Sequence, residues 1–97
     1  MHELTGFQRD LLFVLSGMGT SNGQQLKREL QRKLDEPILP GRIYDNLGVV
    51  IQEGYVLKSE RDGRTNEYRV SPRGKRVIQR RLEWERRQVD SELVLEG

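Results

Sequence analysis

The stretch Ser59–Gly74, SERDGRTNEYRVSPRG, contains four arginines, an Asp-Gly pair and a Ser-Pro pair of the kind that opens helices. Asp62-Gly63 favours a hairpin turn, because aspartate and glycine both tolerate positive φ. Alternating side chains on either side of this turn predict two strands, Tyr55–Glu60 and Asn66–Val70. By the period of two, the side chains that are expected to share one face are Tyr55, Leu57, Tyr68 and Val70. The stretch therefore predicts a β-hairpin with a basic tip, Arg61–Thr65.

Apolar residues at helical spacing predict a first helix, Gly6–Ser16, well before the hairpin. Its start carries a capping box, in which the Thr5 side chain bonds the amide of Gln8 and the Gln8 side chain reaches back. Gly17 suits the left-handed end of this helix.

Two further helices are expected between the first helix and the hairpin. The second can be capped by Ser21 or by Asn22, and Pro37 marks its end. The third begins at Pro40, where the missing amide costs nothing, and Gly54 closes it.

A last, long helix is expected to begin at Ser71-Pro72. The order helix, helix, helix, strand, strand, helix is that of a winged helix-turn-helix, a mostly α fold with a small β-hairpin (α+β). We expect residues 4–71 to form a winged helix-turn-helix DNA-binding domain and residues 72–97 to form a C-terminal dimerisation helix.

Positive charge is concentrated in the middle of the chain, although the formal net charge is only +2. Residues 41–81 carry ten basic and five acidic residues, whereas residues 82–97 carry two basic and five acidic ones. This asymmetry suggests that one face meets an anionic partner. A basic hairpin directly after a helix-turn-helix pattern indicates that the protein binds double-stranded DNA. The alternative is that the arginines serve only to solvate the hairpin.

In a helix-turn-helix the second helix of the motif enters the major groove with its N-terminal residues facing the bases. Arginine can pair with guanine, asparagine with adenine, and aspartate with cytosine N4. On residues 41–53 the candidate contacts are Gly41, Arg42, Tyr44, Asp45 and Asn46. On the wing, residues 59–69, the candidates for phosphate or minor-groove contacts are Arg61, Arg64, Thr65 and Arg69. Gln25, at the start of the second helix, completes the set of candidate DNA contacts.

Reading a palindrome requires two recognition helices about 34 Å apart, so we expect a homodimer. The long last helix can provide this span. The candidate interface residues are Phe7, Leu11, Leu82, Trp84, Val89 and Leu93. The alternative for Trp84 is that it folds back on its own domain.

Two segments, GRIYDNLGVVIQEGYV (Gly41–Val56) and RTNEYRVSPRGKRVI (Arg64–Ile78), resemble the PadR-type transcriptional regulators. They are similar to that family's Gly-x-x-Tyr-x-x-Leu pattern with a following Glu-Gly, and to its Tyr-x-Leu-Thr-x-x-Gly segment. Asp45, Gly48 and Val70-Ser71 depart from the family pattern. The resemblance, closest to short archaeal members, implies a homodimer that binds operator DNA, usually as a repressor, with Tyr44 at the DNA surface.

Other classes of function have little support in the sequence. The chain contains no cysteine and one histidine, His2, so no metal site, cofactor or catalytic serine with a histidine base is expected. No apolar run approaches the roughly 18 residues of a membrane span, and the N-terminus lacks a signal-peptide pattern. We expect a cytoplasmic, nucleoid-associated protein that is not an enzyme and has no evident small-molecule effector. The alternative is a winged-helix module that binds proteins instead of DNA.

Overall fold

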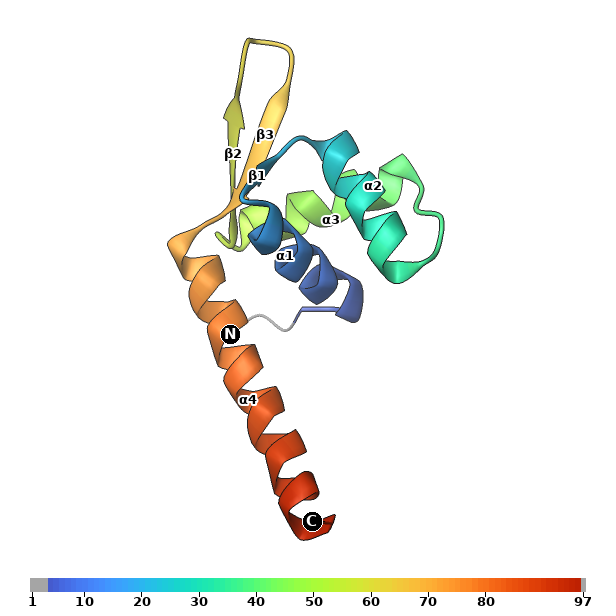
Figure 1. Cartoon of the computed structure of the whole chain (residues 1–97). Coiled ribbons are helices and arrows are strands. Elements are labelled where there is room, and N and C mark those ends of the chain that lie inside the picture. The colour runs from blue at the N-terminus through green and yellow to red at the C-terminus, as the bar shows by residue number, and fades with distance from the viewer. Residues whose placement is uncertain (1–3, 97) are drawn as a thin grey trace.

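The computed structural model describes residues 4–96, and their side chains as far as Asp90. The elements follow one another as α1 (Gly6–Met18), β1 (Thr20–Ser21), α2 (Gly23–Leu34), α3 (Pro40–Gln52), β2 (Val56–Glu60), β3 (Asn66–Val70) and α4 (Pro72–Glu96). The three strands form an antiparallel sheet in the order β1-β3-β2. In Figure 1 the β2–β3 hairpin and the end of α4 extend from the helical body in opposite directions. The predicted winged helix-turn-helix is confirmed.

Local side-chain caps start the first two helices. Thr5 and Gln8 form the predicted capping box of α1. Asn22, rather than Ser21, caps α2 and makes a second capping box with Gln25. Each box satisfies backbone amides that have no partner within the helix.

The predicted end of α1 at Ser16 is two residues too early. Gly17 remains helical, and Gly19, with a φ of 81°, is the residue that ends the helix. A glycine tolerates this left-handed region without the steric cost that a Cβ would add. The two additional helical residues bring the chain to β1, a two-residue strand that the sequence pattern does not reveal.

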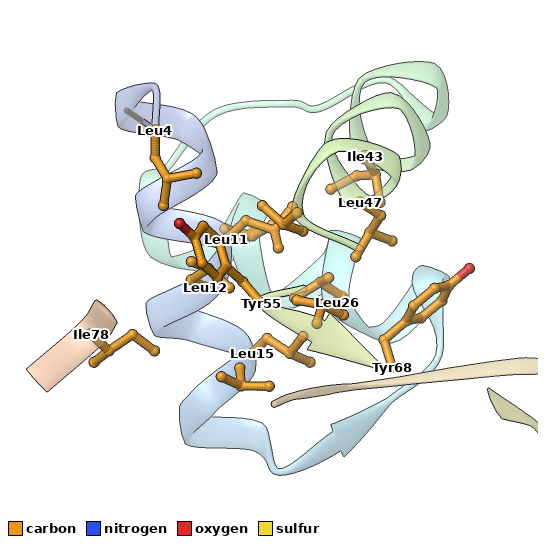
Figure 2. Close-up of a cluster of buried hydrophobic side chains, with 14 of the residues drawn as sticks. Leu4, Leu11, Leu12, Leu15, Leu26, Ile43, Leu47, Tyr55, Tyr68 and Ile78 are labelled. Carbon is orange, nitrogen blue, oxygen red and sulfur yellow. The ribbon is translucent and has the colours of Figure 1, made fainter. Parts of the chain in front are cut away.

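The core lies between α1 and the other elements. Buried leucines of α1 pack against α2, α3 and the base of the sheet, while Tyr68 lies at the edge of the cluster (Figure 2). The fully buried large side chains include Leu11, Leu15, Leu26, Leu30, Ile43, Leu47, Val50 and Tyr55. A single apolar cluster of this kind fits a small domain with one core.

The predicted phase of β2 is wrong. Val56 pairs with Val70 and is buried, whereas Leu57 pairs with Arg69 and is 39% exposed. Since side chains alternate along a strand, Lys58 lies on the same face as its partner Tyr68. Tyr55 is buried, and it precedes the strand that was predicted to begin with it.

The first turns of α4 are built into the domain. The Ser71 hydroxyl donates to the carbonyl oxygen of Gly54 and accepts from the amide of Gly74 at 3.0 Å. A Cβ on Gly74 would lie 2.7 Å from Val70 Cγ1, and closer still to the Tyr55 carbonyl oxygen, so only glycine fits here. Beyond Arg81 every described residue of α4, through Asp90, is exposed.

No helix within the described residues is long and apolar enough to cross a membrane.

Candidate nucleic-acid interface

The polar residues that were predicted on α3 do not share one face. The outward-facing ridge of the helix carries Gly41, Asp45 and Gly48, all exposed. Tyr44 lies on the flank next to α2 and the wing. Arg42 and Asn46 lie on the opposite flank, against α1. The structure therefore divides the predicted base-reading residues into three groups.

Arg42 is held in place by two residues outside α3. Its guanidinium lies over the Phe7 ring, 3.9 Å from the centroid, and its Nη1 is 3.5 Å from Glu36 Oε1. Stacking occupies the flat face of a guanidinium and leaves N–H donors in its plane. The side chain remains about half exposed. These contacts thus orient the Arg42 side chain and leave N–H donors of its guanidinium available.

The Asn46 side chain is engaged at both ends. Its Oδ1 accepts from Gln8 Nε2 at 3.0 Å, and its Nδ2 donates to the carbonyl oxygen of Arg42 at 2.8 Å. The expectation that Asn46 presents a free amide to an adenine is therefore not met. Local spacing alone does not reveal this contact, because its partner lies 38 residues earlier in the chain.

A hollow of about 290 Å³ lies between α2, α3 and the wing. The N-terminus of α2 forms one wall, with its cap Asn22 and the residues Gly23 and Gln24. Its other lining residues are Tyr44, Arg64, Thr65, Asn66 and Tyr68. Unpaired amides and the helix dipole make a helix N-terminus positive, so Arg64 and this terminus together give the hollow the character of an anion site.

Tyr44 and Tyr68 meet at this hollow. Burial raises the pKa of Tyr68, the nearby Tyr44 raises it further, and a hydrogen bond with Asn66 partly offsets these effects. The Tyr68 phenol is consequently neutral at physiological pH and can both donate and accept hydrogen bonds.

The tip of the wing is an ordered five-residue loop. Asp62 Oδ1 accepts from the amides of Arg64 and Thr65, each at 3.1 Å. The amide of Arg61 donates to the carbonyl oxygen of Thr65 at 2.8 Å, and Gly63 has a φ of 82°. Asp62 therefore shapes the loop, while the side chains of Arg61 and Arg64 are exposed.

The remaining predicted DNA contacts, Arg69 and Gln25, lie on different surfaces of the domain. Arg69 lies on the sheet face opposite Tyr68, beside Leu57, and so away from the hollow. Gln25 is exposed, with its Oε1 accepting from the Asn22 amide. Lys58, which was not among the candidates, shares the face of Tyr68.

The predicted dimer residues are also dispersed. Leu11 is buried in the core of its own chain, so its assignment to an interface is wrong. Phe7 lies under Arg42, on the side of α1 that faces α3. Leu82 and Val89 are exposed on α4, at 45% and 53%. The side chain of Leu93 lies outside the described residues.

Trp84 lies at a second hollow, of about 460 Å³, between α1 and α4. Leu12, Phe13 and Val77 contribute to its apolar lining, with several arginines around it. The Arg81 guanidinium lies 4.4 Å from the centre of the Trp84 ring system and bonds Glu85 at 3.1 Å. Trp84 nevertheless remains 46% exposed, so its own domain covers it only in part.

Groups of three or more potential metal ligands are absent from the described part of the chain. This part of the chain therefore offers no candidate for a metal centre.

Comparison with known proteins gives the same fold. A scan of family models and a search of curated proteins found no match. Among solved structures, F93 from STIV, described as a winged-helix DNA-binding protein, is 15% identical, with 88% of this chain and 92% of that chain covered and a TM-score of 0.74. The multiple antibiotic resistance repressor MarR is 15% identical, with 94% and 63% covered and a TM-score of 0.78. At this identity these two share the fold alone.

The similarity to RosR of H. salinarum is much greater. The structure of RosR grown from NaBr is 36% identical to this chain, covering 98% of it and 94% of RosR, with a TM-score of 0.79. A complex structure, RosR-S4, matches with the same identity, covering 98% and 90% of the two chains, and a TM-score of 0.80. The chain belongs to the family of H. salinarum RosR and has the winged-helix fold of DNA-binding regulators.

Proposed function

We propose that this protein is a homodimeric, sequence-specific DNA-binding regulator that represses transcription from a palindromic operator. The observation that carries the proposal is the hollow between α2, α3 and the wing. It brings Tyr44, Arg64 and the N-terminus of α2 to one side of the exposed ridge of α3. With the α3 ridge in the major groove, this hollow receives a backbone phosphate and the wing tip reaches the next minor groove.

The phosphate contacts are assigned to the elements around the hollow. Amides at the start of α2, the Tyr44 hydroxyl and the Arg64 guanidinium hold one phosphate. Thr65 adds a neutral hydrogen bond, and Arg61 and Lys58 supply further positive charge along the wing. The Nε2 group of Gln25 remains available as a donor. Arg69, on the opposite sheet face, contributes only to the general positive field.

The base contacts are assigned to the outward ridge of α3 and to Arg42. Asp45 stands between Gly41 and Gly48, and neither glycine has a neighbouring atom within 4 Å of a built Cβ. Their small size is thus not required by internal packing, and it lets the helix approach base edges closely. Asp45 accepts from cytosine N4, and the stacked Arg42 donates to guanine.

The dimer interface is assigned to α4. The end of this helix extends away from the helical body (Figure 1). Past Arg81 it leaves Leu82, Trp84 and Val89 exposed. A helix whose large apolar side chains are only about half covered within its own chain fits pairing with a second copy. The acidic C-terminal residues of α4 would lie away from DNA, because the wing extends to the opposite side of the body.

Membership among the PadR-type regulators is part of the proposal as well. It rests on the segments Gly41–Val56 and Arg64–Ile78. A regulator of this kind acts in the cytoplasm, in association with the nucleoid.

Selection of bound fragments from a random DNA pool tests the proposed function. A two-fold-symmetric consensus is expected, and log affinity for it should fall linearly with log salt concentration as phosphate counterions are released. No enriched sequence, together with no salt-dependent retention on DNA, would reject the proposal in favour of a protein-binding winged helix.

A further inference from the structure

We infer that Gln8 is a positioning residue for α3, the proposed recognition helix, in addition to its role in the cap of α1. The inference rests on the proposed function. Its basis is a buried amide that joins two elements: Gln8 is only 6% exposed, and its amide group bonds the N-cap of α1 at one end and the middle of α3 at the other.

The hydrogen bonds form a continuous chain from the start of α1 to the first turn of α3. The Thr5 amide donates to Gln8 Oε1 at 3.1 Å, and Gln8 Nε2 donates to Asn46 Oδ1 at 3.0 Å. Asn46 Nδ2 then donates to the Arg42 carbonyl oxygen at 2.8 Å. Because the first donor is a backbone N–H and the last acceptor is a backbone carbonyl, only this orientation of the two amides satisfies every group.

The cap of α1 alone does not require a glutamine. A capping box needs only an acceptor at this position, so glutamate serves as well as glutamine. Glutamate has no N–H, however, and would place a carboxylate against Asn46 Oδ1. The contact with Asn46 is therefore what distinguishes glutamine from glutamate here.

This bridge fixes one flank of α3, and Tyr44 fixes the other. The Tyr44 ring packs against Gly23 at the start of α2, while Asn46 is tied to α1. Because α3 is held on both flanks, its rotation about its own axis is restricted, and the ridge that carries Asp45 keeps a fixed orientation. Loss of the bridge should make this orientation more variable without removing any phosphate contact.

The test compares Gln8→Glu with Asn46→Ala in the full-length chain. The first variant keeps the cap and removes the N–H that Gln8 donates to Asn46, and the second removes the Asn46 side chain without a change of charge. Gln79→Glu, exposed on α4, is the matched control for the added negative charge. Affinity is measured for the selected operator and for random DNA, each across a salt series, alongside thermal unfolding of every variant.

Both bridge variants are expected to lose about five- to tenfold in the ratio of operator to random-DNA affinity, the scale of one buried hydrogen bond. Their salt slopes should match that of wild type, and Gln79→Glu should keep the wild-type ratio. The inference is overturned if both variants keep the wild-type ratio, or if they lose affinity equally for operator and random DNA. If Gln8→Glu fails to fold, the ratio of operator to random-DNA affinity of Asn46→Ala alone tests the inference. Failure of the proposed function would appear in the wild type, as absence of any selected operator.

Discussion

The Tyr44 ring lies directly on Gly23, the first residue of α2, so that a Cβ on Gly23 would lie 2.6 Å from Tyr44 Cε1. Such a separation is shorter than any van der Waals contact, so glycine is the residue that lets α3 and the start of α2 approach. The same pair forms part of the hollow that we assign to a DNA phosphate.

Gly23→Ala should therefore displace Tyr44 and weaken binding to all DNA sequences. The displaced ring opens the hollow and separates the Tyr44 hydroxyl from the α2 amides. Gly17→Ala is the matched control, since no atom lies within 4 Å of a Cβ there and the helix should gain up to about 1 kcal/mol. Equal DNA affinity of the two variants in fluorescence anisotropy would contradict the assignment.

Arg42→Ala should relax discrimination at one or two base pairs of the operator, at a cost of about 1–3 kcal/mol there. Phe7→Leu removes the aromatic face under the guanidinium but keeps the charge, so a smaller loss is expected. Competition assays with single-base operator variants measure both. Equal losses on operator and random DNA for Arg42→Ala would remove it from the base-reading role.

Arg64→Ala should weaken binding to every sequence and reduce the salt slope by about 1, since one phosphate contact is lost. Arg69→Ala is the matched control on the same hairpin, because its side chain lies on the sheet face opposite the hollow. It should leave the slope nearly unchanged. A larger change of slope for Arg69→Ala than for Arg64→Ala would mean that DNA contacts the sheet face opposite the hollow, and would contradict the assignment.

Trp84→Ala should shift the protein toward monomer in sedimentation velocity. Trp84 is the only tryptophan, so its fluorescence should move to shorter wavelength as wild-type protein is concentrated and the ring becomes covered. Leu57→Ala, on the exposed sheet face, should not alter the association. A concentration-independent spectrum with unchanged sedimentation of Trp84→Ala would remove α4 from the interface.

Gly74→Ala should destabilise the fold by about 1–3 kcal/mol, because the added methyl group overlaps Val70 and the Tyr55 backbone. Gly48→Ala, in open space on α3, should instead stabilise the helix by up to about 1 kcal/mol. Thermal or urea unfolding separates the two. A Gly74→Ala protein as stable as Gly48→Ala would mean that α4 can move away from the sheet at little cost.

Local chemistry explains why much of the fold is predictable from the sequence. The Thr5–Gln8 box, Pro40 at the start of α3 and Gly54 after its end each act within a few residues, so the pattern specifies them. The phase of β2 was not specified, because Val56 and Leu57 are adjacent and both apolar. Only pairing with β3 decides that Val56 faces the core.

The candidate site was less predictable, because its geometry depends on contacts between distant residues. Exposure at the start of α3 suggested both Arg42 and Asn46 as base contacts. In the structure, Phe7 stacks under the Arg42 guanidinium and leaves its N–H groups available, whereas Gln8 bonds the Asn46 side-chain oxygen. Leu11 satisfied the apolar spacing of an interface residue as well as that of a core residue. The complete burial of Leu11 in the core, which no local pattern records, separates these possibilities.

The root of α4 adjoins the end of α3 through the Ser71–Gly54 hydrogen bond. The helix proposed to join two copies is thus hydrogen-bonded at its start to the segment that follows the proposed reading helix. The angle at which α4 departs from this contact would then set the helical phase between the two bound sequences. Changing a small residue at this joint is then a direct way to alter which operator lengths the protein accepts.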